Sequence, residues 1–123
     1  MICEHCKKNM DEIAIMERDR ICAVAGINPE HLSFETGHWA VSARQAIWWT
    51  LVVENNFPLT EAVIWTGGHD HTTALYGIRA YGHRVYGFPR KAGAARLREL
   101  WGKRKKRLCI VEIENKAGQE AAA

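Results

Sequence analysis

Long apolar runs are missing from this 123-residue sequence. None approaches the roughly 18–20 consecutive apolar residues that a membrane-spanning helix needs. The N-terminal residues MICEHCKKNMDE also lack the apolar core of a secretory signal peptide. No GxxxxGK[ST] phosphate-binding loop occurs anywhere in the chain. These absences argue against a membrane protein, a secreted protein and a nucleotide-hydrolysing module, so we expect a cytoplasmic protein that binds no nucleotide.

Acidic residues are scarce in one long stretch of the chain. Residues 79–107 contain eleven Lys or Arg side chains and a single acid, Glu99, although the whole chain carries a net charge of only +3. A chain divided in this way presents one strongly positive region, which suits a polyanionic partner. The run ends in a cluster of candidate phosphate contacts, which are Lys103, Arg104, Lys105, Lys106 and Arg107. A solvated helix end is the alternative interpretation of this cluster.

Paired cysteines are also few, since Cys3 and Cys6 form the only CxxC motif. CxxC is half of a zinc site, because its spacing lets two thiolates reach one tetrahedral ion. The candidates to complete such a site are single residues elsewhere, Cys22 on the first expected helix and His5, His31 or His38. The competing interpretation is an N-terminal segment, residues 1–9, with two free thiols and no cofactor. A redox role is disfavoured because the surrounding βαβ pattern is missing.

Helical periodicity and capping signals predict an all-α domain of five or six helices over residues 10–107. Asn9 and Glu12 resemble a capping box for a helix that ends near Gly26, and Ser42 and Gln45 resemble a second one. The expected helices cover about 10–25, a short turn from 28, 42–54, 59–65, 70–86 and 90–106. The helix at 42–54 is expected to be the buried centre, with its tryptophan pair in the core. Residues 108–123 are expected to be a tail, in which LCIVEI at 108–113 has the character of a short strand.

The most informative stretch is GGHDHTTALYGIRAY, residues 67–81. Gly67 and Gly68 predict a tight reversal, since residues without Cβ accept positive φ. Asp70 is a suitable N-cap, whose carboxylate could accept from the N–H of Thr72 or Thr73. Leu59–Trp65 is long enough for about two helical turns before the glycines. Helix, glycine turn and helix together are the sequence form of a helix-turn-helix.

This stretch resembles the signature of the C-terminal DNA-binding domain of the bacterial replication initiator DnaA, usually GG-R-DHTT-V-L-HA-x-R. The matching positions are Gly67, Gly68, Asp70, His71, Thr72, Thr73, Leu75 and Arg79. Upstream, SARQAIWW is similar to RARQIAMYL of that domain, with Arg44 and Gln45 in register. The likeness covers roughly residues 18–101. His69 stands where the family has arginine, Thr60 where it has proline, and the loop before Arg44 contains none of the usual arginines.

The resemblance implies a binder of double-stranded DNA in replication or transcription control, nucleoid-associated and without ATPase activity. It implies that Asp70, His71, Thr72 and Thr73 read the major groove, and His69 is also expected among the DNA-binding residues. Short polar side chains of this kind can hydrogen-bond base edges. Arg44 is similar to the family's minor-groove arginine, and Arg79 also matches the motif. Replication proteins are further possible partners.

Two other function classes stay open at this point. His69, Asp70 and His71 are potential metal ligands, and an adjacent His-Asp pair is used by metal-dependent phosphohydrolases. Such enzymes need additional Asp and His ligands, yet the only other aspartates are Asp11 and Asp19. We therefore expect no enzyme activity. The other alternative is an accessory module that uses the same helices to bind a protein of a phage or replication complex.

Overall fold

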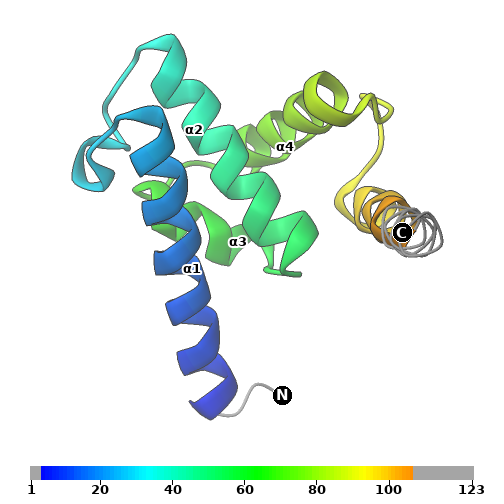
Figure 1. Ribbon diagram of the computed structural model, residues 1–123, viewed down its shortest axis with the longest axis horizontal. Helices are drawn as coiled ribbons and strands as arrows, with labels where there is room; N and C mark the ends of the chain where they lie inside the picture. The colour runs from blue at the N-terminus through cyan, green and yellow to red at the C-terminus, as the bar shows by residue number, and fades with distance from the viewer. Residues whose placement is uncertain (1–3, 107–123) are drawn as a thin grey trace, which may run out of the picture.

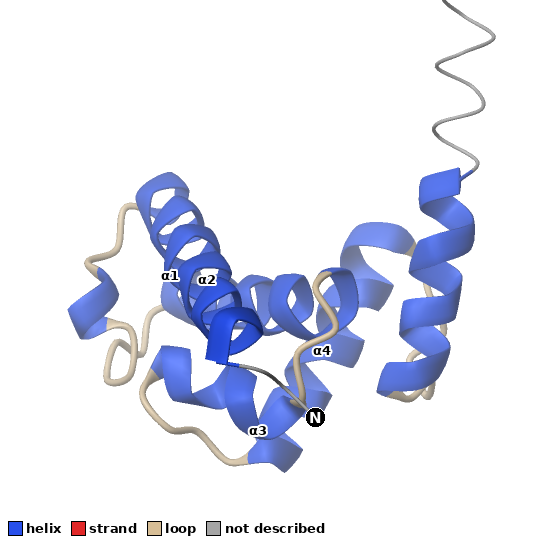
Figure 2. Cartoon of the chain, turned by 90° about the horizontal axis from the view of Figure 1, so that it is seen from below, coloured by secondary structure: helices blue, strands red, loops and turns tan. Residues whose placement is uncertain are grey.

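The computed structural model describes residues 4–106 of the chain, with side chains from Met10 onward. Its elements are α1 (Glu4–Ala25), the one-turn helix η1 (Pro29–His31), α2 (His38–Trp49), the π-helical turn η2 (Thr50–Glu54), α3 (Leu59–Ala62), the 3-10 turn η3 (Val63–Thr66) and α4 (His71–Tyr86). A final helix occupies residues 94–106. The all-α prediction is confirmed: the described residues form helices and loops, with no strand (Figure 2).

α1 is longer at its N-terminal end than the sequence predicted. The helix already includes Glu4, so Asn9 lies inside it, and the predicted cap at Asn9 is wrong. The helix is continuous through Arg18. Its predicted end is confirmed, because Ile27 N–H donates to the Cys22 carbonyl at 2.9 Å and Gly26 N–H to that of Ala23 at 3.3 Å. These two bonds form the Schellman closure of a helix C-terminus.

α2 also begins earlier than predicted, at His38 with Gly37 as its N-cap, so Ser42 lies within the helix. The helix widens into η2, where Asn55 N–H donates to the Thr50 carbonyl at 3.1 Å, five residues back. A π turn of this kind carries one more residue per closed ring than an α turn. Thr50, Leu51, Val52 and Val53 of η2 are all buried, so α2 and η2 form the centre of the core, as predicted.

The core is built where α4 crosses α2 (Figure 1). Trp48 and Trp49 are 3% and 0% exposed, which confirms that the tryptophan pair belongs to the core. Two glycines of α4 face these rings. A Cβ on Gly77 would lie 2.8 Å from Trp48 Cε3, and one on Gly82 would lie 2.5 Å from Trp49 Cζ3. The missing side chains therefore let the two helices approach closely.

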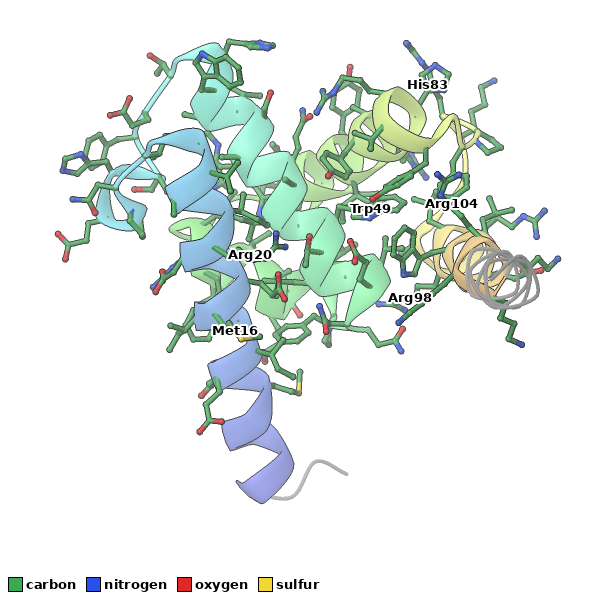
Figure 3. All side chains as sticks on the ribbon, in the orientation of Figure 1. Met16, Arg20, Trp49, His83, Arg98 and Arg104 are labelled. Carbon is green, nitrogen blue, oxygen red and sulfur yellow. The ribbon has the colours of Figure 1, made fainter. Side chains whose placement is uncertain are left out.

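The final helix packs against the end of α4 through an aromatic cluster. Trp49 lies between α2, α4 and this helix (Figure 3), and its ring centroid is 5.4 Å from that of Tyr86 and 6.2 Å from that of Trp101. The helix begins at residue 94 rather than at Arg90 as predicted, because residues 87–93 form a turn whose Gly93 carbonyl accepts from Leu97 N–H at 2.9 Å. The predicted strand at 108–113 lies outside the described residues. Within residues 4–106, no helix is both long and apolar enough to cross a membrane.

Candidate nucleic-acid interface

The predicted helix-turn-helix is present, formed by α3 and η3, a glycine turn and α4. Gly67 and Gly68 have φ of +100° and +82°, so the turn uses the conformation that glycine adopts without strain. A Cβ on Gly67 would also collide with the side chain of Ser33. Gly67 is therefore required for two reasons. Its φ is positive, and the turn packs too closely on the loop that contains Ser33 to admit a side chain.

Asp70 is the N-cap of α4 by its backbone, but not by its side chain. Its carbonyl accepts from Ala74 N–H at 3.1 Å, whereas its carboxylate makes no capping hydrogen bond, so the predicted bond to Thr72 or Thr73 is wrong. Instead, Asp70 Oδ1 lies 3.4 Å from His71 Nδ1, with the two side chains 63% and 65% exposed. The carboxylate is thus available at the surface.

Three polar side chains occupy the exposed first turn of α4. His71, Thr72 and Thr73 all face solvent, while the next residue, Ala74, is completely buried. Buried Ala74, Gly77 and Ile78 fix one face of the helix against the core, so the opposite face is presented outward. The arrangement matches that of a recognition helix, whose N-terminal residues reach into a groove.

His69 is placed differently from its neighbours, because it points back toward the core. Its Nδ1 lies 3.4 Å from Thr66 Oγ1, and its ring meets Trp48 edge-on with centroids 5.5 Å apart. Thr66 Oγ1 in turn accepts from Trp48 Nε1 at 2.8 Å. Desolvation, followed by the nearby charge of Arg44, lowers the pKa of His69 below its usual value of 6.5. A neutral imidazole is therefore favoured at the edge of the turn.

Arg44 holds the loop before α2 in place. Its Nη1 donates to the carbonyls of Leu32 and Glu35, both at 2.8 Å, and burial lowers the pKa of the guanidinium. Its charge also contributes to the lowered pKa of His69. Part of the arginine predicted to reach the minor groove is therefore already bonded to the fold.

Arg79 lies in a basic pocket on the outer face of α4 that the sequence did not reveal. Arg79 Nε donates to the Ala92 carbonyl at 3.1 Å, which ties the helix to the turn at 87–93. The pocket has a volume of about 520 Å³ and is lined by Tyr76, Arg79, Ala80, His83, Arg84 and Arg90. The pocket residues on α4 recur at helical spacing in the sequence, and this pattern could have predicted that they share one face of the helix.

The basic cluster at the end of the final helix lies about the length of α4 away from the glycine turn. Arg104 lies over the Tyr86 ring at 5.0 Å, and Lys103 pairs with Glu99 at 3.3 Å. Tyr86 is fifteen residues after His71, which is about 22 Å along an α-helix. Lys105 and Lys106 are exposed, and Arg107 lies outside the described residues. Arg104 therefore lies beside the C-terminal end of α4, opposite to the first turn of that helix.

The possible metal ligands are not gathered in the described part of the chain. Within it, no three His, Cys, Asp or Glu side chains are placed to share an ion. His69 turns toward Thr66 while Asp70 and His71 face solvent, so the three do not converge. Cys3 and the side chain of Cys6 lie outside the description. Cys22 is buried sixteen residues further along the same helix as Cys6, about 24 Å away by helical rise, so it cannot complete a site there.

Comparison with family models, with curated proteins and with solved structures finds no match for this chain.

Proposed function

We propose that this protein binds double-stranded DNA in a sequence-specific manner through its helix-turn-helix, with α4 as the recognition helix. The biological setting that we propose is replication or transcription control, without ATPase activity. His71, Thr72 and Thr73 would contact base edges, and Asp70 could accept from the exocyclic amine of cytosine. The motif likeness to the DnaA DNA-binding domain supports this assignment.

The observation that carries the proposal is the exposure of His71, Thr72 and Thr73 on the first turn of a helix whose other face is buried. These polar groups lie on the exposed side of the helix, directly after the glycine turn. Positive side chains extend along the same helix at Arg79 and Arg84 and continue to Arg90. A duplex seated on α4 would thus meet hydrogen-bonding groups at one end and positive charge at the other.

The test is a fluorescence anisotropy titration with a DnaA-box duplex and a composition-matched scrambled duplex, over a series of salt concentrations. We expect a preference for the box of at least tenfold, which corresponds to about 1.4 kcal/mol. Equal and steeply salt-dependent binding to both duplexes would retain DNA binding but require another target sequence. Selection from random duplexes would then identify that target.

A second candidate function, binding to a partner protein, is favoured by one apolar feature. A groove of about 470 Å³ runs between α1, α2 and α4, and its rim includes Val24 and Trp39, which are 85% and 71% exposed. Exposed apolar side chains beside a groove are typical of protein-binding surfaces. Absence of binding to either duplex at low salt would favour this function over DNA binding.

A further inference from the structure

The basic pocket on α4, whose lining residues lie between Tyr76 and Arg90 in the sequence, has side chains that suit a bound phosphate. Three of its side chains are arginines, and none of the lining residues is acidic. A guanidinium presents several N–H donors in a planar fork that matches phosphate oxygens. An aromatic ring, Tyr76, stands 73% exposed at the edge of the pocket. The lining therefore suits an anion that carries oxygen acceptors.

Two of these side chains are held in place by the backbone of the turn at 87–93. Arg79 Nε donates to the Ala92 carbonyl, which leaves its terminal nitrogens without a hydrogen-bond partner among residues 10–106. His83 Nδ1 lies 3.1 Å from the Phe88 carbonyl. A carbonyl only accepts hydrogen bonds, so Nδ1 is the donor of this contact, and Nε2 of the neutral ring is an acceptor. His83 projects from the last turns of α4 (Figure 3). Arg79 is therefore the donor that the turn holds in place before a ligand arrives.

The position of the pocket relative to the first turn of α4 indicates which phosphate it would take. Thr72, Tyr76, Arg79 and His83 follow one another at spacings of four, three and four residues, so they form a stripe along one face. From Thr72 to His83 this stripe covers about 16 Å at the helical rise per residue. The major groove of B-DNA is about 12 Å wide. A helix with Thr72 in the groove thus brings Arg79 and His83 to the sugar-phosphate strand at its edge.

We infer that the pocket lined by Tyr76, Arg79, His83, Arg84 and Arg90 binds a backbone phosphate of the duplex, beside the groove that the first turn of α4 enters. This inference rests on the proposed function for its choice of ligand. The contact is independent of base sequence, because phosphates carry no sequence information. It fixes how far α4 is inserted and in which direction it points.

Arg90→Gln tests the inference, since Arg90 lies in the turn outside the helix and is exposed. Binding of a scrambled duplex over a salt series should show a slope of log K against log salt lower by roughly 0.9, as for one lost phosphate contact. The box duplex should lose affinity by the same factor. Arg96→Gln, which removes an equal charge from a side chain paired with Glu99 at 2.9 Å, is the matched control and should leave the slope unchanged.

The outcomes separate this inference from the proposed function. DNA binding with an unchanged slope in Arg90→Gln, or an equal decrease in Arg96→Gln, would overturn the phosphate site and leave the reading role of α4 intact. If the wild-type protein binds no DNA, inorganic pyrophosphate is titrated against it and followed by NMR. Saturable shifts of the Tyr76 and His83 ring signals that disappear in Arg90→Gln would support the phosphate site alone, and absence of such shifts would overturn it.

Discussion

Gly82 of α4 lies against the ring of Trp49 of α2 so closely that a Cβ at position 82 would be 2.5 Å from Trp49 Cζ3. Gly77, five residues earlier, has the same relationship to Trp48. Both rings are buried. The separation between α4 and α2 is therefore set by glycines, because a side chain at either position would collide with a tryptophan ring.

Substitution of Gly82 by alanine should destabilise the protein. The added methyl group has no space, and overpacking of a core usually costs about 1–3 kcal/mol, even though alanine favours the helix. The free energy of unfolding in urea measures the loss. Gly102→Ala is the matched control, because its Cβ meets nothing within 4 Å and it lies inside the final helix. We expect that change to be stabilising by up to about 1 kcal/mol. A Gly82→Ala protein as stable as the wild type would contradict this packing.

Arg98 should be important for stability rather than for binding. Its Nε donates to the Val52 carbonyl and its Nη2 to the Phe57 carbonyl, both at 2.9 Å, and it points from the final helix toward the end of η2 (Figure 3). Arg98→Met leaves those two carbonyls unbonded, with an expected loss of about 1–3 kcal/mol in unfolding free energy. Arg96→Met removes only an exposed ion pair and should change it by less than about 1 kcal/mol. Similar losses in the two variants would show that the carbonyl contacts contribute little.

His71→Ala should reduce sequence discrimination more than overall affinity. One good base contact contributes about 1–3 kcal/mol of preference for the correct base, so the ratio of box to scrambled affinity should fall accordingly. The anisotropy titration with both duplexes measures this ratio. His38→Ala, at the exposed start of α2, serves as the control histidine. Equal loss of affinity on both duplexes would remove His71 from the base-reading set.

Stability should fall at mildly acidic pH because of His69. Its pKa is lowered in the folded state, so below its ordinary value of 6.5 the unfolded chain takes up the proton first. Stability then decreases with falling pH until the folded-state pKa is passed. Urea unfolding at pH 7.5 and 5.5 should show a smaller decrease for His69→Gln than for the wild type. The remaining histidines are common to both proteins, so an identical decrease would show that His69 is not desolvated.

The elements that the sequence predicted best are those with strong local signals. The bounds of α4 were predicted well because Gly67 and Gly68 precede the helix and Gly87 follows it. All three glycines have positive φ, which is a local property of the backbone. The start of α2 was missed because Ser42 and Gln45 imitate a capping box, while Gly37 caps the helix without any side chain. When two local motifs predict different first residues for a helix, the packing of the folded chain determines which one begins it.

The site was only partly accessible to sequence reasoning for a related reason. The exposed positions of His71 to Thr73 follow from helical periodicity. By contrast, Arg44 reaches carbonyls nine and twelve residues away, and these meet it only after the chain has folded. Arg90 joins the pocket because the turn at 87–93 folds back onto Arg79. No spacing rule along a single helix could have included it.

The hydrogen bond from Trp48 Nε1 to Thr66 Oγ1, 2.8 Å long and buried, has a consequence for the thermodynamics of association. It anchors the residue just before the glycine turn to the deepest part of the core. This bond restrains the start of the turn in the free protein, so part of its conformational entropy is already lost during folding. Complex formation should accordingly show only the modest negative heat-capacity change of two preformed surfaces, without the larger signature of coupled folding.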